Sequence, residues 1–432
     1  MSKIIGIRRE DKNEWEKRVP LVPKHLKELK KQHDIDVVIQ PSSIRIFPDE
    51  EYIKNGAMVK EDLSKCPVVF AVKEIPMDFF KKGKTYVFFA HVIKGQKHNM
   101  PMLKKMMNLK CTLIDYEKIA DEQGRRLVFF GRYAGIAGMV DSLWAFGQRM
   151  RSLGNITPFN EIKQATNYHD INEIKSHLEK ISNAIKQWGI PNSISPMVVG
   201  FAGYGHVSKG AQEILDILPI EEINPQDINF IHQNPSNNVV YKVVFREKDM
   251  VEPISKDINF DLQDYYSNPH KYRSVFNQYV PHLSILMNCI YWSDCYPRLI
   301  TKKDIKEAFT GEMKLQVIGD ISVDVNGAIE FTEKVTNPGR PVFVYNPLKD
   351  EIIDDYDSKG VVVMAVDNLP CEIPRESSKA FSQTLLEFIP PIANSDFSKN
   401  FDSLDIPSEI KKAIILHNGK LTPDYEYINK FL

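Results

Sequence analysis

Cysteine is scarce in this sequence, and several common catalytic motifs are missing from it. The five cysteines among 432 residues are an odd number, lie far apart and include no CxxC pair. This pattern argues against a disulfide framework and a zinc knuckle, and it favours a reducing compartment. No group of His, Cys, Asp and Glu has metal-ligand spacing, so no metal is expected. The GxSxG elbow of hydrolases and the phosphate-binding GKS/T loop are absent as well.

The sequence also lacks a long apolar run and a net charge. Its longest uncharged stretch, residues 188–208, is interrupted by Gly, Pro, Ser, Asn and His, so no membrane span is expected. The N-terminal MSKIIGIRRED resembles neither a secretory signal nor a transit peptide, which predicts a cytoplasmic protein. The 56 basic and 57 acidic residues leave a formal net charge of -1, which predicts no nucleic-acid-binding surface.

Short apolar runs alternate with amphipathic stretches, and the length suggests two to three domains. Such alternation predicts βαβ units and an α/β fold of two Rossmann-like domains, with mostly parallel sheets and a substrate cleft between them. The predicted strands of the first domain are 3–7, 37–40, 67–72, 85–90 and 111–114, with helices over 23–32 and 100–108. A long helix from residue 130 leads to a second series with strands at 197–202, 220–223, 284–291 and 315–321.

For three other segments, the sequence pattern does not define the structure or the domain as clearly. Strands at 342–345 and 360–366 fit either domain. Residues 224–281 are rich in Asn and Pro and too long for an ordinary βα connection, so we expect a small excursion or a substrate-side flap there.

The run MVVGFAGYGHVSKGAQEIL combines an apolar strand, a glycine turn and an amphipathic helix. In this context the glycines of the turn favour a dinucleotide phosphate site at the helix N-terminus, although a purely structural turn is the alternative. The residues expected to contact the dinucleotide are Gly203, Tyr204, Gly205, His206, Val207 and Ser208. The acids Glu221 and Glu222 follow at the spacing of a ribose-binding acid and favour NAD. No Arg or Lys occurs from 211 to 241 to bind a 2′-phosphate, but a basic group from elsewhere would serve.

Two predicted strands of the first domain end in titratable residues. VVFAV runs into Lys73 and Glu74, and TYVFFA runs into His91. Because ligands bind beyond the carboxyl ends of parallel strands, Lys73 and His91 are candidates for an acid–base pair. The ordinary alternatives are a strand exit to solvent and a hydrogen-bonded core histidine. Arg18, in EKRVPLVP, is either a solvated side chain or a carboxylate-binding group.

Several motifs, in order along the chain, resemble the alanine dehydrogenase/transhydrogenase superfamily. Within it, the sequence is most similar to L-lysine-forming saccharopine dehydrogenases, especially the lysine–ketoglutarate reductase half of bifunctional alpha-aminoadipic semialdehyde synthases. The matching stretches are WEKRVPLVPKHL, YVFFAHVIKGQ, LIDYEKIADEQGRR, FGRYAGIAGM, GYGHVSKGAQEI, PRLIT, GDISVDVNGAIEF and VDNLP…PRESS. The resemblance covers nearly the whole chain and implies a stand-alone reductase.

The resemblance also implies roles for individual residues. Lys73 and His91 match the family's catalytic pair, and Arg18 matches a residue that binds a substrate carboxylate. The other implied substrate-binding residues are Lys94, Glu117, Arg126 and Phe130, and the implied cofactor-binding residues beyond the glycine loop are Arg125, Asp324, Val366, Asp367 and Asn368. The implied first domain is discontinuous, with a substrate domain over 1–140 and 326–432 and a dinucleotide domain over 141–325.

The implied reaction condenses L-lysine with 2-oxoglutarate and reduces the imine to saccharopine with a nicotinamide cofactor. The resemblance favours NADP(H), whereas the acid at Glu221 or Glu222 favours NAD(H). Two alternatives stay open: a related dehydrogenase acting on another amine or oxo acid, as alanine dehydrogenase does, and a non-catalytic dinucleotide sensor.

Overall fold

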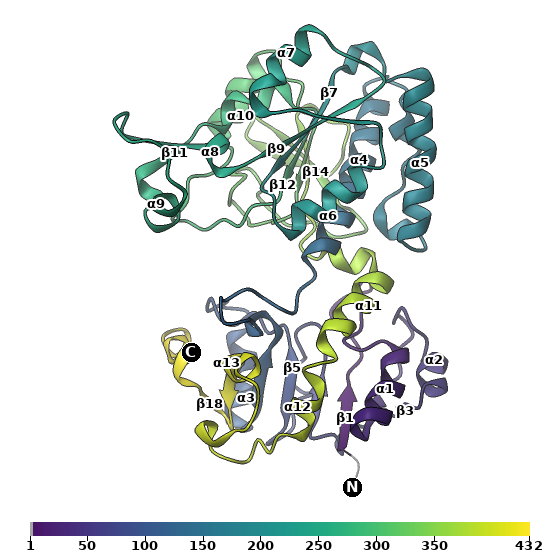
Figure 1. The fold of residues 1–432 in the computed structure, drawn as a ribbon, viewed down its shortest axis with the longest axis vertical. Coiled ribbons are helices and arrows are strands. Elements are labelled where there is room, and N and C mark those ends of the chain that lie inside the picture. Colours follow the sequence, from purple (N-terminus) through teal and green to yellow (C-terminus); the bar gives the residue numbers. More distant parts are fainter. Residues whose placement is uncertain (1–2) are drawn as a thin grey trace. The chain divides into compact units, whose positions relative to one another are not determined.

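A computed structural model describes residues 3–432 of the chain, which form two compact units (Figure 1). Unit 1 contains the chain up to Phe130 together with Pro374–Leu432, and unit 2 contains Gly131–Ile373. Each unit is built on its own eight-stranded, mostly parallel sheet, which confirms the predicted α/β fold with two Rossmann-like domains.

The sheet of unit 1 has the strand order β18-β17-β6-β5-β4-β1-β2-β3. Strands β1 to β6 run parallel, and β17 and β18 add antiparallel strands at one edge. Its strands are β1 (Lys3–Ile7), β2 (Ile35–Ile39), β3 (Met58–Val59), β4 (Val68–Phe70), β5 (Thr85–Phe88), β6 (Thr112–Asp115), β17 (Ile414–His417) and β18 (Lys420–Leu421). Its helices are α1 (Pro23–His33), α2 (Asp49–Lys54), α3 (Met100–Asn108), α11 (Pro374–Leu385), α12 (Ile389–Asn394) and α13 (Ser408–Lys412).

The sheet of unit 2 has the order β15-β14-β16-β13-β12-β7-β9-β8. Its strands are β7 (Met197–Ala202), β8 (Ile220–Glu222), β9 (Val240–Phe245), β12 (Ile285–Asn288), β13 (Val317–Asp320), β14 (Val342–Asn346), β15 (Glu351–Ile353) and β16 (Val361–Met364). Its helices are α4 (Gly131–Ser152), α5 (Ile171–Trp188), α6 (His206–Leu215), α7 (Ile228–Gln233), α8 (Glu247–Met250), α9 (Leu262–Ser267) and α10 (Lys302–Thr310). A separate antiparallel pair is formed by β10 (Val251–Pro253) and β11 (Tyr272–Ser274).

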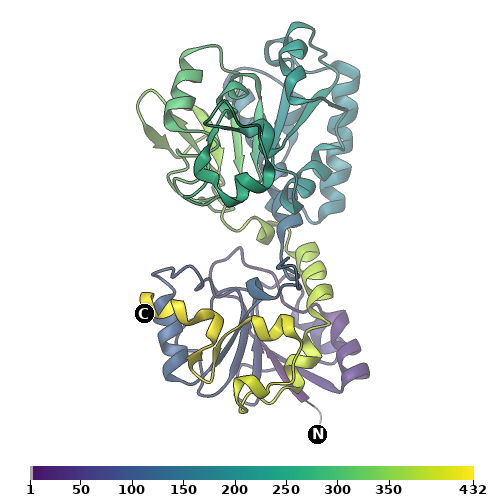
Figure 2. The ribbon, with the colours of Figure 1, turned by 60° about the vertical axis from the view of Figure 1, so that its left-hand side comes forward.

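Helices cover both faces of the unit 2 sheet, which explains why inner strands such as β7 and β16 are apolar along their whole length (Figures 1 and 2). Alternate residues of β7 enter different cores: Val199 packs with residues of α4, α5 and α6, whereas Val198 packs with residues of α7 and α10. Helix α5 shows how local sequence sets its bounds. The Asp170 side chain accepts a hydrogen bond from the Glu173 backbone N–H at its start, and Gly189 at φ 75° follows its end.

Helices α4 and α6 approach closely because glycines lie where their backbones meet. A Cβ added to Gly210 of α6 would lie 2.0 Å from the Arg132 carbonyl oxygen, and one added to Gly135 of α4 would lie 1.9 Å from the Val207 carbonyl oxygen. The sequence places Ser208 at the third small position of the glycine turn, but the close helix packing depends on Gly210 and Gly135.

The chain returns to unit 1 at residue 374, not at 326 as predicted, and it first leaves unit 1 at 131 rather than 141. The later boundary follows from strand pairing. Strand β16 pairs in parallel with β13, and β14 pairs antiparallel with β16, so both strands left open by the sequence extend the second sheet. Unit 1 is nevertheless made of two separated stretches of chain.

The expectation of an excursion over residues 224–281 was wrong in part. This segment contains β9, an inner strand of the unit 2 sheet between β7 and β8, before the small elements from α8 to β11. The sequence pattern does not predict this strand, because Asn- and Pro-rich turns precede it and Lys242 interrupts its apolar run. Over residues 3–432, no helix is both long and apolar enough to cross a bilayer.

Candidate active site

Four parallel strands of unit 1 end at one edge of its sheet, and titratable residues follow each of them. In space these strands are consecutive, in the order β6-β5-β4-β1. Glu10 follows β1, Lys73 and Glu74 follow β4, His91 follows β5, and Asp115 ends β6. Because the carboxyl ends of parallel strands meet at one edge, residues far apart in the sequence are brought together there.

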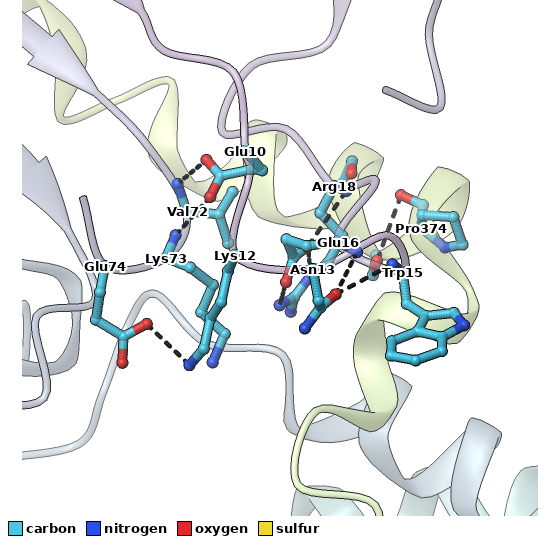
Figure 3. Close-up of polar contacts among 12 residues, drawn as sticks. Glu10, Lys12, Asn13, Trp15, Glu16, Arg18, Val72, Lys73, Glu74 and Pro374 are labelled. Carbon is cyan, nitrogen blue, oxygen red and sulfur yellow. Dashed lines mark hydrogen bonds and ion pairs between the residues drawn. The ribbon is translucent and has the colours of Figure 1, made fainter. Parts of the chain in front are cut away.

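The Glu74 carboxylate lies at the centre of this group. One of its oxygens is 2.7 Å from Nδ1 of His91. The other is 3.1 Å from Nζ of Lys12, a contact that Figure 3 shows. Burial opposes ionisation of Glu74, but the hydrogen bond and charge of His91, with the charges of Lys12 and Lys73, lower its pKa below the ordinary value of 4.5. Glu74 is therefore a carboxylate at neutral pH and accepts its hydrogen bonds.

Lys73 is held by the backbone that carries it. The Glu10 carboxylate accepts hydrogen bonds from the backbone N–H groups of Val72 (2.7 Å) and Lys73 (3.0 Å), which ties the segment after β1 to the segment after β4 (Figure 3). Burial and the nearby charge of Arg18 lower the pKa of the Lys73 ammonium. A lowered pKa increases the neutral amine fraction that acid–base chemistry needs.

His91 has a left-handed backbone conformation, with φ 48°. Residues other than glycine adopt this region at a cost, so the surrounding structure must hold it. The Asn99 amide donates to the carbonyl oxygens of Ala90 and His91, both at 3.1 Å, and a carboxylate oxygen of Asp115 accepts from the Ala90 N–H at 3.2 Å. These bonds fix the imidazole at the strand end, where its side chain is one-third exposed.

Two further buried carboxyl groups lie at this edge. Burial and the neighbouring charge of Glu16 raise the pKa of Glu10 to about 7. Burial likewise raises the pKa of Asp115 to about 7. Both carboxyl groups accept backbone hydrogen bonds, and their raised pKa values place them close to the protonation boundary at neutral pH.

Arg18 is buried in a two-point ion pair with Glu16. Its Nε and Nη2 lie 2.8 and 2.6 Å from the two Glu16 carboxylate oxygens, and its guanidinium lies 4.4 Å from the centre of the Phe130 ring. Phe130 in turn stacks on Phe381 of α11, with ring centres 4.5 Å apart. The predicted substrate-binding residues Arg18 and Phe130 are therefore in contact, but the guanidinium already binds a carboxylate of the chain itself.

The remaining predicted residues of unit 1 lie around the same edge or beyond it. Glu117 forms an ion pair with Arg126 within the segment after β6. Arg125 is exposed, and its Nε lies 2.7 Å from the Asp121 carboxylate. Lys94 is exposed and lies six residues after the end of β5.

In unit 2, the glycine turn has the geometry of a phosphate site. Gly203 has φ +94°, a conformation that favours glycine, and its N–H donates to the Phe245 carbonyl oxygen at 3.1 Å. A Cβ added to Gly205 would meet no atom within 4 Å, so the space above this residue is open to a ligand. Helix α6 begins at His206, and its first-turn N–H groups have no acceptor within the helix. The turn thus fits a dinucleotide phosphate.

Most other predicted cofactor residues follow strands whose carboxyl ends lie at the same sheet edge as this turn. Asp324 lies after β13 and Val366, Asp367 and Asn368 lie after β16, and these strands run parallel to β7 in the order β16-β13-β12-β7. Arg125 lies in unit 1, and Glu222 is separated from β7 by β9. It ends β8, the outermost strand, and its carboxylate is 2.9 Å from Nζ of Lys242.

Sequence reasoning missed several residues of this site. Glu10, Lys12, Glu16, Asn99 and Asp115 carried no assigned role, and Glu74 was only the neighbour of Lys73. Glu10 follows β1 and Asp115 ends β6, so the strand-end rule that selected His91 would have selected them too. Among residues 3–432, no group of His, Cys, Asp and Glu is arranged to hold a metal ion.

Comparison with known proteins gives consistent matches. Residues 6–137 match the model for the N-terminal domain of alanine dehydrogenase/PNT, and residues 270–424 match the model for its C-terminal domain. The alpha-aminoadipic semialdehyde synthase of Arabidopsis thaliana is 37% identical over 98% of this chain, but the match covers only 41% of that protein. The chain therefore spans less than half the length of this curated relative.

Two further matches extend over nearly complete proteins. The saccharopine dehydrogenase [NAD(+), L-lysine-forming] of Emericella nidulans is 28% identical over 81% of this chain and 82% of its own length. A solved L-alanine dehydrogenase structure superposes with a TM-score of 0.63 at 17% identity, covering 99% of this chain and 100% of its own. The structural match is evidence of a shared fold.

Proposed function

The chain belongs to the alanine dehydrogenase/PNT family, and from this membership we propose that it reductively joins L-lysine and 2-oxoglutarate to form saccharopine. The observation that carries the proposal is the contact of Glu74 with His91 beside Lys73, at one sheet edge. The names of the relatives in Arabidopsis thaliana and Emericella nidulans support this substrate class. For this chain, the substrates L-lysine and 2-oxoglutarate and the product saccharopine are all part of the proposal.

The proposed condensation needs a base and an acid. The substrate amine must lose a proton as it attacks the ketone, and the departing hydroxyl must gain one as water leaves. We assign these two transfers to Lys73 and His91. The lowered pKa of Lys73 supports its use as a base, and Glu74, a carboxylate, accepts from Nδ1–H of His91. Nδ1 therefore keeps its proton, and in the imidazolium form the second proton is on Nε2, from which His91 can protonate the departing hydroxyl.

Substrate carboxylates need cationic partners, and saccharopine has three carboxylates. Arg18 is our candidate for one of them. Because Glu16 already binds two of its nitrogens, a substrate carboxylate has to share the guanidinium with Glu16 or displace it. The cations Lys12, Lys94 and Arg126 lie in the segments that follow β1, β5 and β6, and we propose that they supply the rest of the positive field.

A nicotinamide dinucleotide supplies the hydride when it is bound. We propose that the turn at Gly203 and Gly205 holds its phosphates, as the open space at Gly205 and the start of α6 support. We further propose that the cofactor is NADP(H), and that the protein works in a reducing compartment, the cytoplasm. The five cysteines, which are all free thiols, support the reducing compartment.

The test is a matrix of substrates and cofactors with purified protein. NADH and NADPH are each combined with lysine, other amines and ammonia on one side, and with 2-oxoglutarate and pyruvate on the other. We expect cofactor oxidation only when lysine and 2-oxoglutarate are both present. Turnover of pyruvate with ammonia instead would make the protein an alanine dehydrogenase, and cofactor binding without any turnover would make it a sensor.

A further inference from the structure

The strand order of unit 2 changes which residue lies beside the glycine turn. In a dinucleotide domain of the usual order, the second strand of the series lies next to the strand that enters the turn, and the residue after it contacts the ribose. Here β8 is the second strand in the sequence but lies at the sheet edge, and β9 pairs directly with β7. The residue position that contacts the ribose is therefore the one directly after β9.

The register of the strands shows how far Glu222 is from the turn. Ala202, the last residue of β7, pairs with Phe245 of β9, whereas Glu222 of β8 pairs with Lys242. Glu222 thus lies three residues short of the end of β9, about 10 Å along the strands, and two strands, about 10 Å, to the side of β7. Its carboxylate is 2.9 Å from Nζ of Lys242, which also binds Asp216 at 2.9 Å. Glu222 is a partner of this lysine and is not at the ribose position.

The residue that follows β9 is an arginine. Arg246 comes directly after Phe245, whose carbonyl oxygen accepts a hydrogen bond from the Gly203 N–H at 3.1 Å, so the two segments are joined at the turn. The guanidinium lies over the ring of Tyr204, the residue between the two glycines, at 4.9 Å from its centre. Arg246 is exposed, and within residues 3–432 its guanidinium forms no ion pair within 4.0 Å of a carboxylate.

The carboxylate of the next residue, Glu247, already accepts hydrogen bonds from two tyrosine hydroxyl groups. It accepts hydrogen bonds from the hydroxyl of Tyr266 at 2.7 Å and from the hydroxyl of Tyr204 at 3.2 Å. These bonds hold the Tyr204 ring beneath Arg246 and engage the acid that would otherwise be the natural partner of a ribose hydroxyl.

We propose that Arg246, stacked on Tyr204, forms a subsite for the 2′-phosphate of the dinucleotide, and so selects NADP(H) over NAD(H). The inference rests on the proposed function, because it requires that the turn at Gly203 binds a dinucleotide. An unpaired guanidinium presents several N–H donors to a phosphate dianion, and its stacking on an aromatic ring fixes the plane of those donors. Glu222, whose spacing favours NAD, has no part in this choice.

The test compares two nucleotides that differ only in the 2′-phosphate, 2′,5′-ADP and 5′-AMP, by isothermal titration calorimetry with the full chain. We expect 2′,5′-ADP to bind on the order of 10–100-fold more tightly, as is typical of charge-assisted hydrogen bonds to one phosphate. Arg246→Ala should abolish the difference and leave the affinity for 5′-AMP unchanged. Arg246→Lys, which keeps the charge but loses the planar donors, should keep part of it.

Arg151→Ala is the matched control. It removes the same side chain from the same unit, but Arg151 is near the C-terminal end of α4, 16 residues or about 24 Å along the helix from Gly135, which packs against α6. This variant should retain the full preference. Thermal unfolding of each variant checks that the fold is intact.

Each outcome separates this inference from the proposed function. If neither nucleotide binds, the turn is not a dinucleotide site and both proposals fall. If both bind equally in the wild type, or if Arg246→Ala keeps the preference, the dinucleotide site stands and the 2′-phosphate subsite is refuted. If 5′-AMP binds more tightly and Glu247→Gln removes that preference, Glu247 reads the ribose hydroxyl and the protein prefers NAD(H).

Discussion

The substitution Glu74→Gln isolates the charge that the structure places against His91. The amide has nearly the same size and can still accept a hydrogen bond from Nδ1, but it carries no charge. When His91 takes a proton during the reaction, the wild-type carboxylate, 2.7 Å from Nδ1, stabilises the imidazolium that forms. The variant loses this stabilisation, and we expect kcat to fall.

The size of the effect follows from the geometry. At the lower limit, a hydrogen bond to a charged group is worth about 1 kcal/mol more than a neutral one. At the upper limit, two unit charges about 4 Å apart at an effective dielectric constant of about 20 attract by about 4 kcal/mol. Each 1.36 kcal/mol is tenfold in rate, so kcat should fall between about 5-fold and about 10³-fold.

The assay is steady-state oxidation of NAD(P)H with saturating lysine and 2-oxoglutarate. Two variants serve as controls. Lys12→Met removes the other partner of Glu74. Because the Lys12 side chain is 40% exposed, its loss should lower kcat by no more than about 5-fold. Glu61→Gln makes the same chemical change at an exposed carboxylate paired with Arg9, and it should leave kcat unchanged. A folded Glu74→Gln variant with kcat within twofold of the wild type would refute the reasoning.

Three further predictions concern stability and can be checked by urea or thermal unfolding. Glu16→Gln removes the negative charge that lies against the buried Arg18 guanidinium and should lower the free energy of unfolding by about 3–5 kcal/mol. Gly210→Ala places a Cβ 2.0 Å from a backbone carbonyl of α4 and should cost at least about 1–3 kcal/mol, whereas Gly311→Ala, whose nearest atom would be 3.5 Å away, should cost far less. The pKa of Glu74 is lowered on folding, so its carboxylate contributes stability above its ordinary value of 4.5, and this contribution is lost as the pH falls through the lowered pKa. The stability difference between the wild type and Glu74→Gln should therefore shrink as the pH falls below about 4.5, and a constant difference would contradict this.

Most of the sheet elements could be predicted because their strands are short apolar runs bounded by turns. The strands at 3–7 and 197–202 were found with their observed bounds. Strand β9 could not be recognised in the same way, because the pattern around Lys242 is interrupted and its flanks look like loop. A lysine is tolerated inside this strand since its ammonium reaches Asp216 and Glu222, a contact that only the folded sheet creates.

The candidate site was predictable only where one strand end is enough to mark a residue. Lys73 and His91 were found because each follows an apolar strand. The contacts that join them to the rest of the site depend on the spatial order of strands, which places β1 beside β4 and so brings Glu10 to the backbone of Val72, 62 residues away. Strand order also decides that Arg246, rather than Glu222, follows the strand next to β7.

The most direct test of the central claim, that Lys73 and His91 act together as acid and base, is kcat for lysine, 2-oxoglutarate and NAD(P)H in Lys73→Ala and His91→Ala variants. Cofactor binding by calorimetry is measured on the same samples. The account predicts that each substitution lowers kcat by about 10²–10⁴-fold while the cofactor still binds with wild-type affinity. Folded variants that retain kcat close to the wild-type value would contradict it.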